Sequence, residues 1–412
     1  MVRTLLPISA LLLGSAFLLF GGGINNLILP LRGGSEGFSA LSLGLLGTGW
    51  AVGYVLGCIL MSAVVGRVGH IRAFSVTAAF AAIAILGSLL AVTPWVWIPL
   101  RGVQGFCFAG AAMIVESWLG ERAEPHTRGR IFGVYTMVNL AASTAGQLVL
   151  SQGDTSGFLF FVLAAMFYCL ALVPTAMSSS STPKPLVSVR LDLRGLWRNS
   201  PVAVFGVFMA GISNATFGTL SAVYGERVGL NLATITLFAS IPVLAGALSQ
   251  IPVGYLSDRM DRRKVLLGLA VIALAVDLCF ILIQPEGRTL NLAFVAVFGA
   301  SIYAMYPVIV AHANDHAPPG TYIQVSGGLL MVFGLGSIIG PLVAGWGMTG
   351  SDPRALFLTT VAAHVLMALF TLLRLARRAP VAAEDKGAFV FQPMARPATP
   401  QTADLARGIA AE

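Results

Sequence analysis

Long apolar runs separated by short polar or charged connections make up most of the chain. About 20 apolar residues form a helix that crosses roughly 30 Å of hydrocarbon. No region shows the alternating segments of about ten residues that are typical of a transmembrane β-barrel. The pattern therefore predicts an all-α membrane protein with twelve transmembrane helices. The expected spans are 5–31, 40–65, 73–92, 95–119, 130–150, 157–176, 201–224, 233–256, 265–283, 290–311, 323–347 and 354–373.

The longest connection, residues 177–200, divides the spans into two sets of six. Residues 23–26 match 211–214, and Gly146 matches Gly340 at a similar offset. Such matches indicate a duplicated six-helix unit, and hence two pseudo-symmetric bundles. The expected parts are an N-terminal bundle (1–176), a cytoplasmic central loop (177–200), a C-terminal bundle (201–375) and a disordered cytoplasmic tail (376–412), which is rich in Ala and Pro.

Composition supports a membrane protein and argues against nucleic-acid binding. The 412 residues are 57% hydrophobic and only 10% charged. The net charge is +8, but with a cytoplasmic N-terminus its distribution follows the positive-inside rule. We therefore expect a multi-pass protein of the bacterial cytoplasmic membrane, with both termini cytoplasmic and a monomeric state. The Lys and Arg residues that fall outside the cytoplasmic side are Arg32, Arg101, Arg227, Arg288 and Arg354.

A dense run of charge, Gly254 to Lys264, lies between the eighth and ninth spans. An eroded copy, Ala63 to Arg72, occupies the same place between the second and third spans. Gly66 in the first copy stands where Asp258 stands in the second. A charged loop repeated in both halves suggests a transporter in which one half rocks against the other.

These two loops resemble the G-x-L-a-D-R-x-G-R-[RK] motif of the major facilitator superfamily, and Arg101 to Gly105 resembles its R-x-x-Q-G motif. The runs Val115–Leu119, Arg128–Tyr135 and Ala304–Val308 further resemble a YcaD-like group of bacterial permeases. The resemblance implies a twelve-helix transporter that works by alternating access. It also implies a central substrate site and gates at the charged loops.

Two departures from the superfamily pattern affect these expectations. The first loop lacks the acidic residue of the motif, because Gly66 takes its place. The fifth span, 130–150, contains no proline, so the motif associated with drug and proton antiporters is missing. The second departure makes multidrug efflux a weaker hypothesis.

Arg101 is the strongest single candidate for a functional residue. An ionised side chain within an apolar helix is costly unless it faces a cavity or a partner. We expect it to bind an anionic substrate group or to tune a proton site, with Gln104 on the same helix face. The structural alternative is a side chain that snorkels toward the periplasmic surface.

Glu116 lies near the cytoplasmic end of the same span, fifteen residues after Arg101 and about 22 Å along the helix. That separation excludes a direct pair. One interpretation is an ion pair with Arg67, Arg72 or Arg130 that closes the cytoplasmic side. The other interpretation makes Glu116 a proton carrier.

Other polar residues in the spans are candidates for the lining of a central cavity. Each of them can instead be a hydrogen bond between helices, and each tyrosine can be core packing. Glycine stripes on the second and eleventh spans permit the close approach that a moving interface needs. The cavity candidates are Asn25, Asn26, Asn139, Gln147, Asn214, Gln250, Tyr303 and Tyr306.

The charged residues of the two loops are candidates for gating. Asp258 can meet the positive end of a neighbouring helix, and the arginines can form pairs that break as a gate moves. Asp277 is the other acidic residue deep in a span, and we expect it to make a structural hydrogen bond. The arginines assigned to gating are Arg67, Arg72, Arg259, Arg262 and Arg263.

Enzyme and metal chemistry are not supported by the sequence. Gly33 to Gly37 matches a G-x-S-x-G pattern, but it lies in a loop between helices. His312 and His316 have helical spacing but flank polar residues at a helix end, so we expect no metal site. No cofactor is expected, and the chain lacks an ATP-binding P-loop.

The expected function is secondary transport of a small organic solute, with coupling to protons. The alternatives are an efflux pump for amphipathic compounds and a membrane sensor or assembly factor that has kept the fold without transport.

Overall fold

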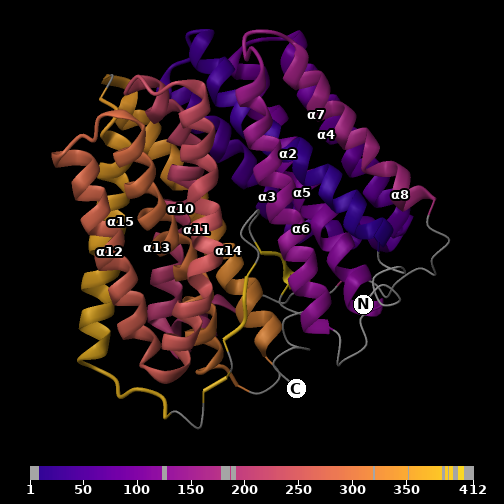
Figure 1. Cartoon of the computed structure of the whole chain (residues 1–412). Helices are drawn as coiled ribbons and strands as arrows, with labels where there is room; N and C mark the ends of the chain where they lie inside the picture. Colours follow the sequence, from indigo (N-terminus) through magenta and orange to yellow (C-terminus); the bar gives the residue numbers. More distant parts are fainter. Residues whose placement is uncertain are drawn as a thin grey trace. The chain divides into compact units, whose positions relative to one another are not determined.

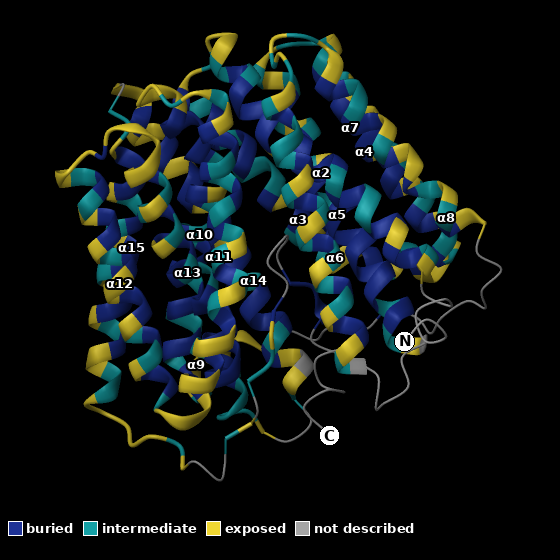
Figure 2. Ribbon diagram, in the orientation of Figure 1, coloured by how far each residue is buried: buried dark blue, intermediate teal, exposed yellow. Residues whose placement is uncertain are grey.

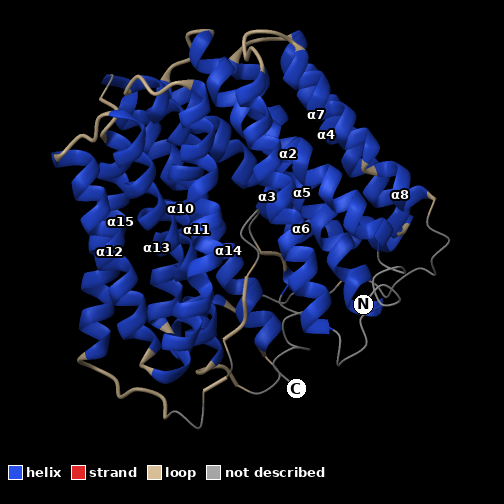
Figure 3. Cartoon of the chain, viewed as in Figure 1, coloured by secondary structure: helices blue, strands red, loops and turns tan. Residues whose placement is uncertain are grey.

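The computed structural model consists of α-helices joined by loops, with short 3₁₀ turns (Figure 3). It describes residues 9–122, 128–177, 186, 192–318, 321–350, 352–382, 386–387, 389–392 and 398–402, without the side chains of 122, 128 and 323. Most of the predicted central loop and much of the predicted tail therefore lie outside the described residues. Within the described part of the loop, Asp192 caps a short helix, α9 (Leu193–Asn199), by accepting a bond from the Gly195 amide.

The helices follow the predicted spans in order. In the first half they are α2 (Ser9–Ser35), α3 (Ala40–Val68), α4 (His70–Leu90), α5 (Pro94–Arg122), α6 (Arg128–Leu148), α7 (Leu159–Leu170) and α8 (Leu172–Ala176). In the second half they are α10 (Pro201–Arg227), α11 (Leu232–Arg259), α12 (Arg262–Leu282), α13 (Gly287–Asn314), α14 (Tyr322–Gly347) and α15 (Ala355–Leu375). The 3₁₀ turns are η3 (Val149–Gln152) and η4 (Met348–Gly350).

Eleven helices in the described part of the chain are long and apolar enough to cross a membrane, with α7 and α8 forming one span. The remaining predicted span, 130–150, forms α6. Its polar residues Asn139, Ser143 and Gln147 make this helix less apolar than the others. The prediction of an all-α membrane protein is confirmed.

The chain forms two compact units, and each is built around one set of helices (Figure 1). Unit 1 comprises Met1–Phe38, Gly49–Val189 and Ala395–Glu412. Unit 2 comprises Ser39–Thr48 and Arg190–Met394. The unit boundary therefore falls near the start of α3, whereas the sequence prediction placed all of that helix in the N-terminal bundle.

The two units repeat the same helix pairings. In unit 1, α2 packs on α6 and α7, and α4 packs on α5 and α7. In unit 2, α10 packs on α14 and α15, and α12 packs on α13 and α15. The corresponding helices of the two halves thus have corresponding partners, and the prediction of pseudo-symmetric six-helix bundles is confirmed.

Glycines set the close approach of these helix pairs. A Cβ on Gly23 of α2 would overlap the carbonyl of Ser143 in α6, and one on Gly211 of α10 would overlap the carbonyl of Phe333 in α14. Gly53 of α3 lies in the same way against Gly102 of α5. The glycine stripes on α3 and α14 therefore permit close packing of helices within each unit.

Exposed residues recur along the helices (Figure 2), and many of them are large and apolar. On α4, Val76, Phe80 and Ile83 follow one another at helical spacing, and each is about half exposed or more, at 49%, 50% and 60%. Such a stripe is unfavourable in water and suits contact with lipid chains.

The described tail residues are packed against the two units, which departs from the expectation of disorder. Gln392 is 6% exposed, Thr399 2% and Thr402 1%. Arg378 donates to the carbonyl of Asn199 at 2.7 Å. The Ala- and Pro-rich composition that predicted disorder does not report the polar contacts that the folded units offer.

Candidate functional site

Arg101 lies in unit 1 at the centre of a small polar cluster between α2 and α5. Its Nη1 donates to Gln104 Oε1 at 3.1 Å, and its Nη2 donates to Asn26 Oδ1 at 3.2 Å. Asn25 Nδ2 donates to the same Gln104 oxygen at 2.8 Å. The predicted helix face with Arg101 and Gln104 is present, and α2 supplies the two asparagines.

The Arg101 cluster is buried but contains no counter-charge among the described residues. Arg101 is 9% exposed, Gln104 is fully buried and Asn25 is 1% exposed, whereas Asn26 is exposed. The partners of the guanidinium are neutral amides, and no carboxylate in the described part of the chain forms an ion pair with it. Burial of an unpaired charge costs several kcal/mol. The buried charge of Arg101 therefore lowers the stability of the fold, which indicates that the residue serves a purpose other than packing.

Polar atoms without a partner surround the guanidinium. Asn25 Oδ1, Gln104 Nε2 and the hydroxyl of Tyr168 are buried and have no hydrogen-bond partner among the described residues. Tyr168 belongs to α7 and is fully buried beside the cluster, with its hydroxyl near Asn25 but outside hydrogen-bond geometry. Buried polar groups are almost always hydrogen-bonded, so a group of unpaired ones marks a place that a further molecule can complete.

Asn139 and Gln147, both on α6, are the remaining polar candidates of unit 1. Asn139 is 1% exposed and accepts from the Ser15 hydroxyl at 2.7 Å, which joins α6 to α2. Gln147 is half-buried on the same helix. Asn139 thus forms a hydrogen bond between helices, which was the alternative to a role in lining the cavity.

The candidates on α10 and α13 of unit 2 are two tyrosines with packing partners and one asparagine. Tyr306 is 9% exposed and packs edge-on against Phe333, with ring centroids 5.3 Å apart. Tyr303 lies against Gly246 of α11, whose missing side chain makes room for it. Asn214 is half-buried, and its Oδ1 has no hydrogen-bond partner.

Gln250 of α11 binds the tail. It accepts from the Gln392 amide at 2.9 Å and donates to the Gln392 carbonyl at 3.2 Å. Both polar ends of the Gln250 side chain are therefore engaged by one residue of main chain. This contact was not predicted, because the tail was expected to be disordered.

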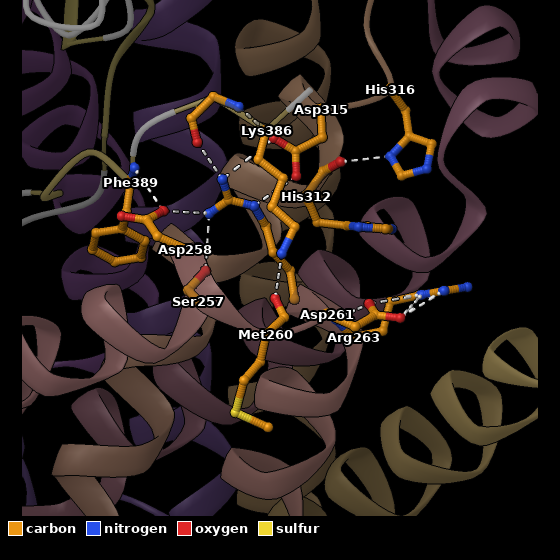
Figure 4. Close-up of polar contacts among 12 residues, drawn as sticks. Ser257, Asp258, Met260, Asp261, Arg263, His312, Asp315, His316, Lys386 and Phe389 are labelled. Atoms are coloured by element: carbon orange, nitrogen blue, oxygen red, sulfur yellow. Dashed lines mark hydrogen bonds and ion pairs between the residues drawn. The ribbon is translucent and has the colours of Figure 1, made fainter. Parts of the chain in front are cut away.

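Arg262, the first residue of α12, is the most connected side chain of the charged loop, and its partners Ser257, Asp258 and Asp315 are labelled in Figure 4. It is 1% exposed and binds Asp315 through Nε at 2.6 Å and Nη2 at 3.3 Å. Its Nη1 donates to Ser257 Oγ at 2.9 Å and to Asp258 at 3.3 Å. Its Nη2 also donates to the carbonyl of Gly387. One arginine thus joins the ends of α11, α12 and α13 to the tail.

The tail closes this network from the other side. Gly387 donates its amide to Asp315 at 3.1 Å, and Phe389 donates its amide to Asp258 at 3.1 Å. Lys386 Nζ donates to the Met260 carbonyl at 2.6 Å. Both carboxylates are therefore shared between Arg262 and backbone amides of the tail.

Asp261 and Arg263 form a second pair at the start of α12. Asp261 accepts from the Arg263 amide at 3.0 Å, so it caps the helix, and it also forms a salt bridge with Arg263 Nη2 at 2.7 Å. Burial acts to raise the pKa of Asp261, but the hydrogen bonds from Arg263 outweigh it and hold this pKa below its usual value. Arg263 also donates to the carbonyls of Arg374 and Arg378 at the end of α15 and beyond it.

Asp315 lies just after α13, next to His312 and His316, whose spacing was considered for a metal site in the sequence. Burial raises the pKa of Asp315, and the bonds from Arg262 act against that shift. The rings of His312 and His316 meet edge to face at 4.6 Å, and His316 Nδ1 is 2.9 Å from the His312 carbonyl. The useful signal in this segment was Asp315, which the sequence analysis did not single out.

Glu116 of α5 is fully buried in unit 1 and bound by tail hydroxyls. Thr402 donates to its two oxygens at 2.8 Å and 3.0 Å, and Thr399 donates to one of them. These contacts differ from the predicted ion pair between Glu116 and one of the three arginines Arg67, Arg72 and Arg130. Arg67, Arg72 and Arg130 are exposed, and none of the three pairs with a carboxylate among the described residues.

Asp277 makes the structural contact that the sequence analysis expected, with a partner that it missed. Asp277 of α12 accepts from the Thr360 hydroxyl at 2.7 Å and lies 2.6 Å from His364 Nδ1, both on α15. All three side chains are fully buried. His364 stands alone in an apolar span, which was the available signal.

Comparison with known proteins settles the family. The model of the Major Facilitator Superfamily matches residues 11–244 and 203–402. The chain belongs to the Major Facilitator Superfamily. It is therefore a multi-pass membrane protein of a transporter family and not an enzyme.

Relatives and solved structures agree with this assignment. The chain is 26% identical to YcaD of Shigella flexneri, an uncharacterized MFS-type transporter, over 91% of this chain and 97% of the relative. It is 27% identical to YcaD of Salmonella arizonae over the same shares. The expected resemblance to the YcaD group is confirmed.

The fold is also that of solved transporters. The nucleoside transporter NupG superposes with a TM-score of 0.75 at 13% identity, over 89% of this chain and 98% of that one. A bacterial homolog of the human lysosomal transporter Spinster gives 0.72 at 14% identity, over 95% and 99%. A D-xylose-proton symporter gives 0.66 at 16% identity, over 93% and 98%.

Proposed function

We propose that this superfamily member is a secondary active transporter that moves a small organic solute by alternating access. The observation that carries the proposal is the buried Arg101 cluster of unit 1. A transmembrane helix holds a cation there with neutral amides, and three buried polar atoms of the cluster have no partner in the described part of the chain. Ionised residues inside membrane spans mark substrate or ion pathways.

The proposed location is the bacterial cytoplasmic membrane, with a single chain as the working unit and both termini in the cytoplasm. The distribution of Lys and Arg along the sequence supports this orientation. Gradients of protons or solutes across that membrane provide the energy for transport without ATP.

Protons are the proposed coupling ion, and Glu116 is the proposed carrier. Glu116 is a fully buried carboxylate whose oxygens receive hydroxyl donors from Thr399 and Thr402. Hydroxyl groups can donate to the ionised form and accept from the protonated form, so they can accompany a change of protonation. Gates at Asp258, Arg259, Arg262 and Arg263, with Arg67 and Arg72 in the other loop, complete the proposal.

Transport in reconstituted vesicles tests the proposal. A solute found by thermal-shift screening of the purified protein against metabolites, vitamins and dyes is supplied outside proteoliposomes, with and without a pH gradient. We expect uptake or export that Arg101→Ala abolishes and that an uncoupler reduces. Arg288→Ala, an exposed arginine at the start of α13, is the matched control and should transport normally.

Three results would contradict parts of this proposal. Unchanged transport by Arg101→Ala would remove the central role of the cluster. Transport that does not respond to external pH or to the uncoupler would contradict proton coupling. In that case Glu116→Gln should leave the pH dependence unchanged. A chain that binds solutes but moves none of them would favour a sensor with a transporter fold.

A further inference from the structure

We propose that the Arg101 cluster selects a substrate with a single negative charge on a carboxylate or a similar oxyanion. This inference rests on the proposed transport function and specifies the chemical class of its substrate. It follows from three features of unit 1: the missing counter-charge, the unpaired donors and the geometry of the guanidinium.

The counter-charge is absent because every described carboxylate of unit 1 has another place. Glu36 pairs with Arg32 at 2.6 Å, and Asp154 is bound by Ser156. Glu116 is held by the tail hydroxyls, and it follows Arg101 by fifteen residues, about 22 Å along the helix. Glu121 lies one further turn away and is exposed. The positive charge of Arg101 therefore remains unbalanced by the described residues of its own unit.

The groups around Arg101 provide donors for an oxyanion. Gln104 Nε2 and the Tyr168 hydroxyl are buried donors that find no acceptor in the part of the chain that the structure describes. A guanidinium presents parallel N–H groups that match a carboxylate with two hydrogen bonds, and the pairing is strongest where water is excluded. An anion at this position would satisfy the charge and these donors together.

One arginine sets the limit on substrate charge. A second negative charge would need a second buried cation, and the described partners of the cluster are the amides Asn25, Asn26 and Gln104. A neutral solute would leave the guanidinium unpaired, and a cation would be repelled by it. The cluster therefore favours monoanions over neutral amides of the same shape.

Matched ligand pairs test the proposal on the purified full-length protein. The probes are benzoate with benzamide, nicotinate with nicotinamide, and acetate with acetamide, at equal ionic strength set with NaCl. We expect carboxylates to raise the unfolding temperature of the wild type by about 2 °C or more at saturation, and the amides to raise it less. Arg101→Gln should lose the carboxylate effect, and Arg288→Gln should keep it.

A second variant tests the missing counter-charge without any ligand. Gln104→Glu puts a carboxylate 3.1 Å from the guanidinium and replaces an Nε2 that has no partner, so no hydrogen bond of that atom is lost. We expect the ligand-free variant to unfold at a higher temperature than the wild type and to bind none of the carboxylates.

Each possible result either supports or overturns the anion site at Arg101. Equal shifts with carboxylates and amides, equal shifts in wild type and Arg101→Gln, no shift with any carboxylate, or a lower unfolding temperature for Gln104→Glu overturns the anion site. Carboxylate binding that depends on Arg101, in a protein that moves no solute into vesicles, would support the site and contradict transport. Transport of a neutral solute by Arg101→Gln would support the transport function and contradict the anion site.

Discussion

The loops that follow α3 and α11 occupy equivalent places in the two units and have opposite characters. In the second loop, Asp261 caps α12 with its side chain, and Arg262 is buried among four side-chain and main-chain partners. In the first loop, Gly69 precedes α4 without a side-chain cap, and His70 takes the place of Arg262. His70 is 3% exposed, and its Nε2 has no hydrogen-bond partner among the residues that the structure describes.

The difference shows that a repeated motif can keep its position while only one copy keeps its interactions. The second loop joins three helix ends to the tail through charge. The first loop relies on backbone conformation, since Gly69 has a φ of 83°, and on packing of His70 near Trp118 at 6.1 Å between ring centroids. Loss of the acidic residue at Gly66 therefore coincides with loss of the whole network.

The largest effect should come from removing the buried charge at the centre of the second loop. Arg262→Ala leaves Asp315, which is 2% exposed, without its cation. Removal of one partner of a buried ion pair costs about 3–5 kcal/mol. Denaturant unfolding of the purified protein measures this change. Arg67→Ala, at an exposed position in the last turn of α3, should change stability by less than about 0.5 kcal/mol. Similar losses in the two variants would contradict the contrast.

Transport should depend on the acidic residue of the second loop more than on its counterpart. Asp258→Asn removes the charge that Arg262 and the Phe389 amide share, and we expect it to slow transport in vesicles several-fold. Gly66→Asp restores an acidic residue at an exposed position with open space around its Cβ, so it should fold normally. We expect it to change the rate less than Asp258→Asn does. The reverse order would show that the eroded loop is the working gate.

The backbone of the first loop offers a smaller test. Gly69→Ala forces a side chain into a left-handed conformation and should cost about 1–3 kcal/mol. Gly66→Ala lies in α3 with nothing near its Cβ and should be neutral or stabilise by up to about 1 kcal/mol. Thermal unfolding of both variants gives the comparison. A tolerated Gly69→Ala would mean that this turn can change shape freely.

The smallest expected effect is a pH dependence at the start of α12. Because the folded pKa of Asp261 is lowered, its ionised form stabilises the protein above the unfolded pKa of about 3.9. That contribution is lost as pH falls through the folded pKa. The difference in unfolding temperature between wild type and Asp261→Asn should therefore be largest near pH 6 and should shrink in acid.

A second substitution makes the pH test specific to the salt bridge. In an Arg263→Gln background the hydrogen bonds that lower the pKa of Asp261 are weakened. The pH-dependent effect of adding Asp261→Asn to that background should then be smaller than its effect in the wild type. An unchanged pH profile would assign the effect to the helix cap alone.

The helices and the Arg101 face could be predicted because both depend on local spacing. Apolar runs of sufficient length determine spans, and residues three apart, such as Arg101 and Gln104, share a helix face. The duplicated bundle was predictable for a similar reason, since Gly23 and Gly211 each mark one repeat and make equivalent contacts.

Partners distant in sequence could not be predicted. Arg262 binds Asp315, 53 positions away, and Asp277 contacts His364, 87 positions away. Such pairs depend on which helices become neighbours and on their rotation, and a single sequence does not report either. The tail was missed because its contacts with Glu116 and Gln250 use short polar groups that resemble those of a disordered segment.

The described tail residues Gly387, Phe389 and Gln392 bind other parts of unit 2 through their main chain. Gly387 contributes an amide and a carbonyl, Phe389 an amide, and Gln392 an amide and a carbonyl. Main-chain groups are common to nearly all residue types, so many substitutions would keep these bonds. Deletion of one residue would instead displace every later group from its partner. The segment should therefore vary freely in composition during evolution while its length stays fixed.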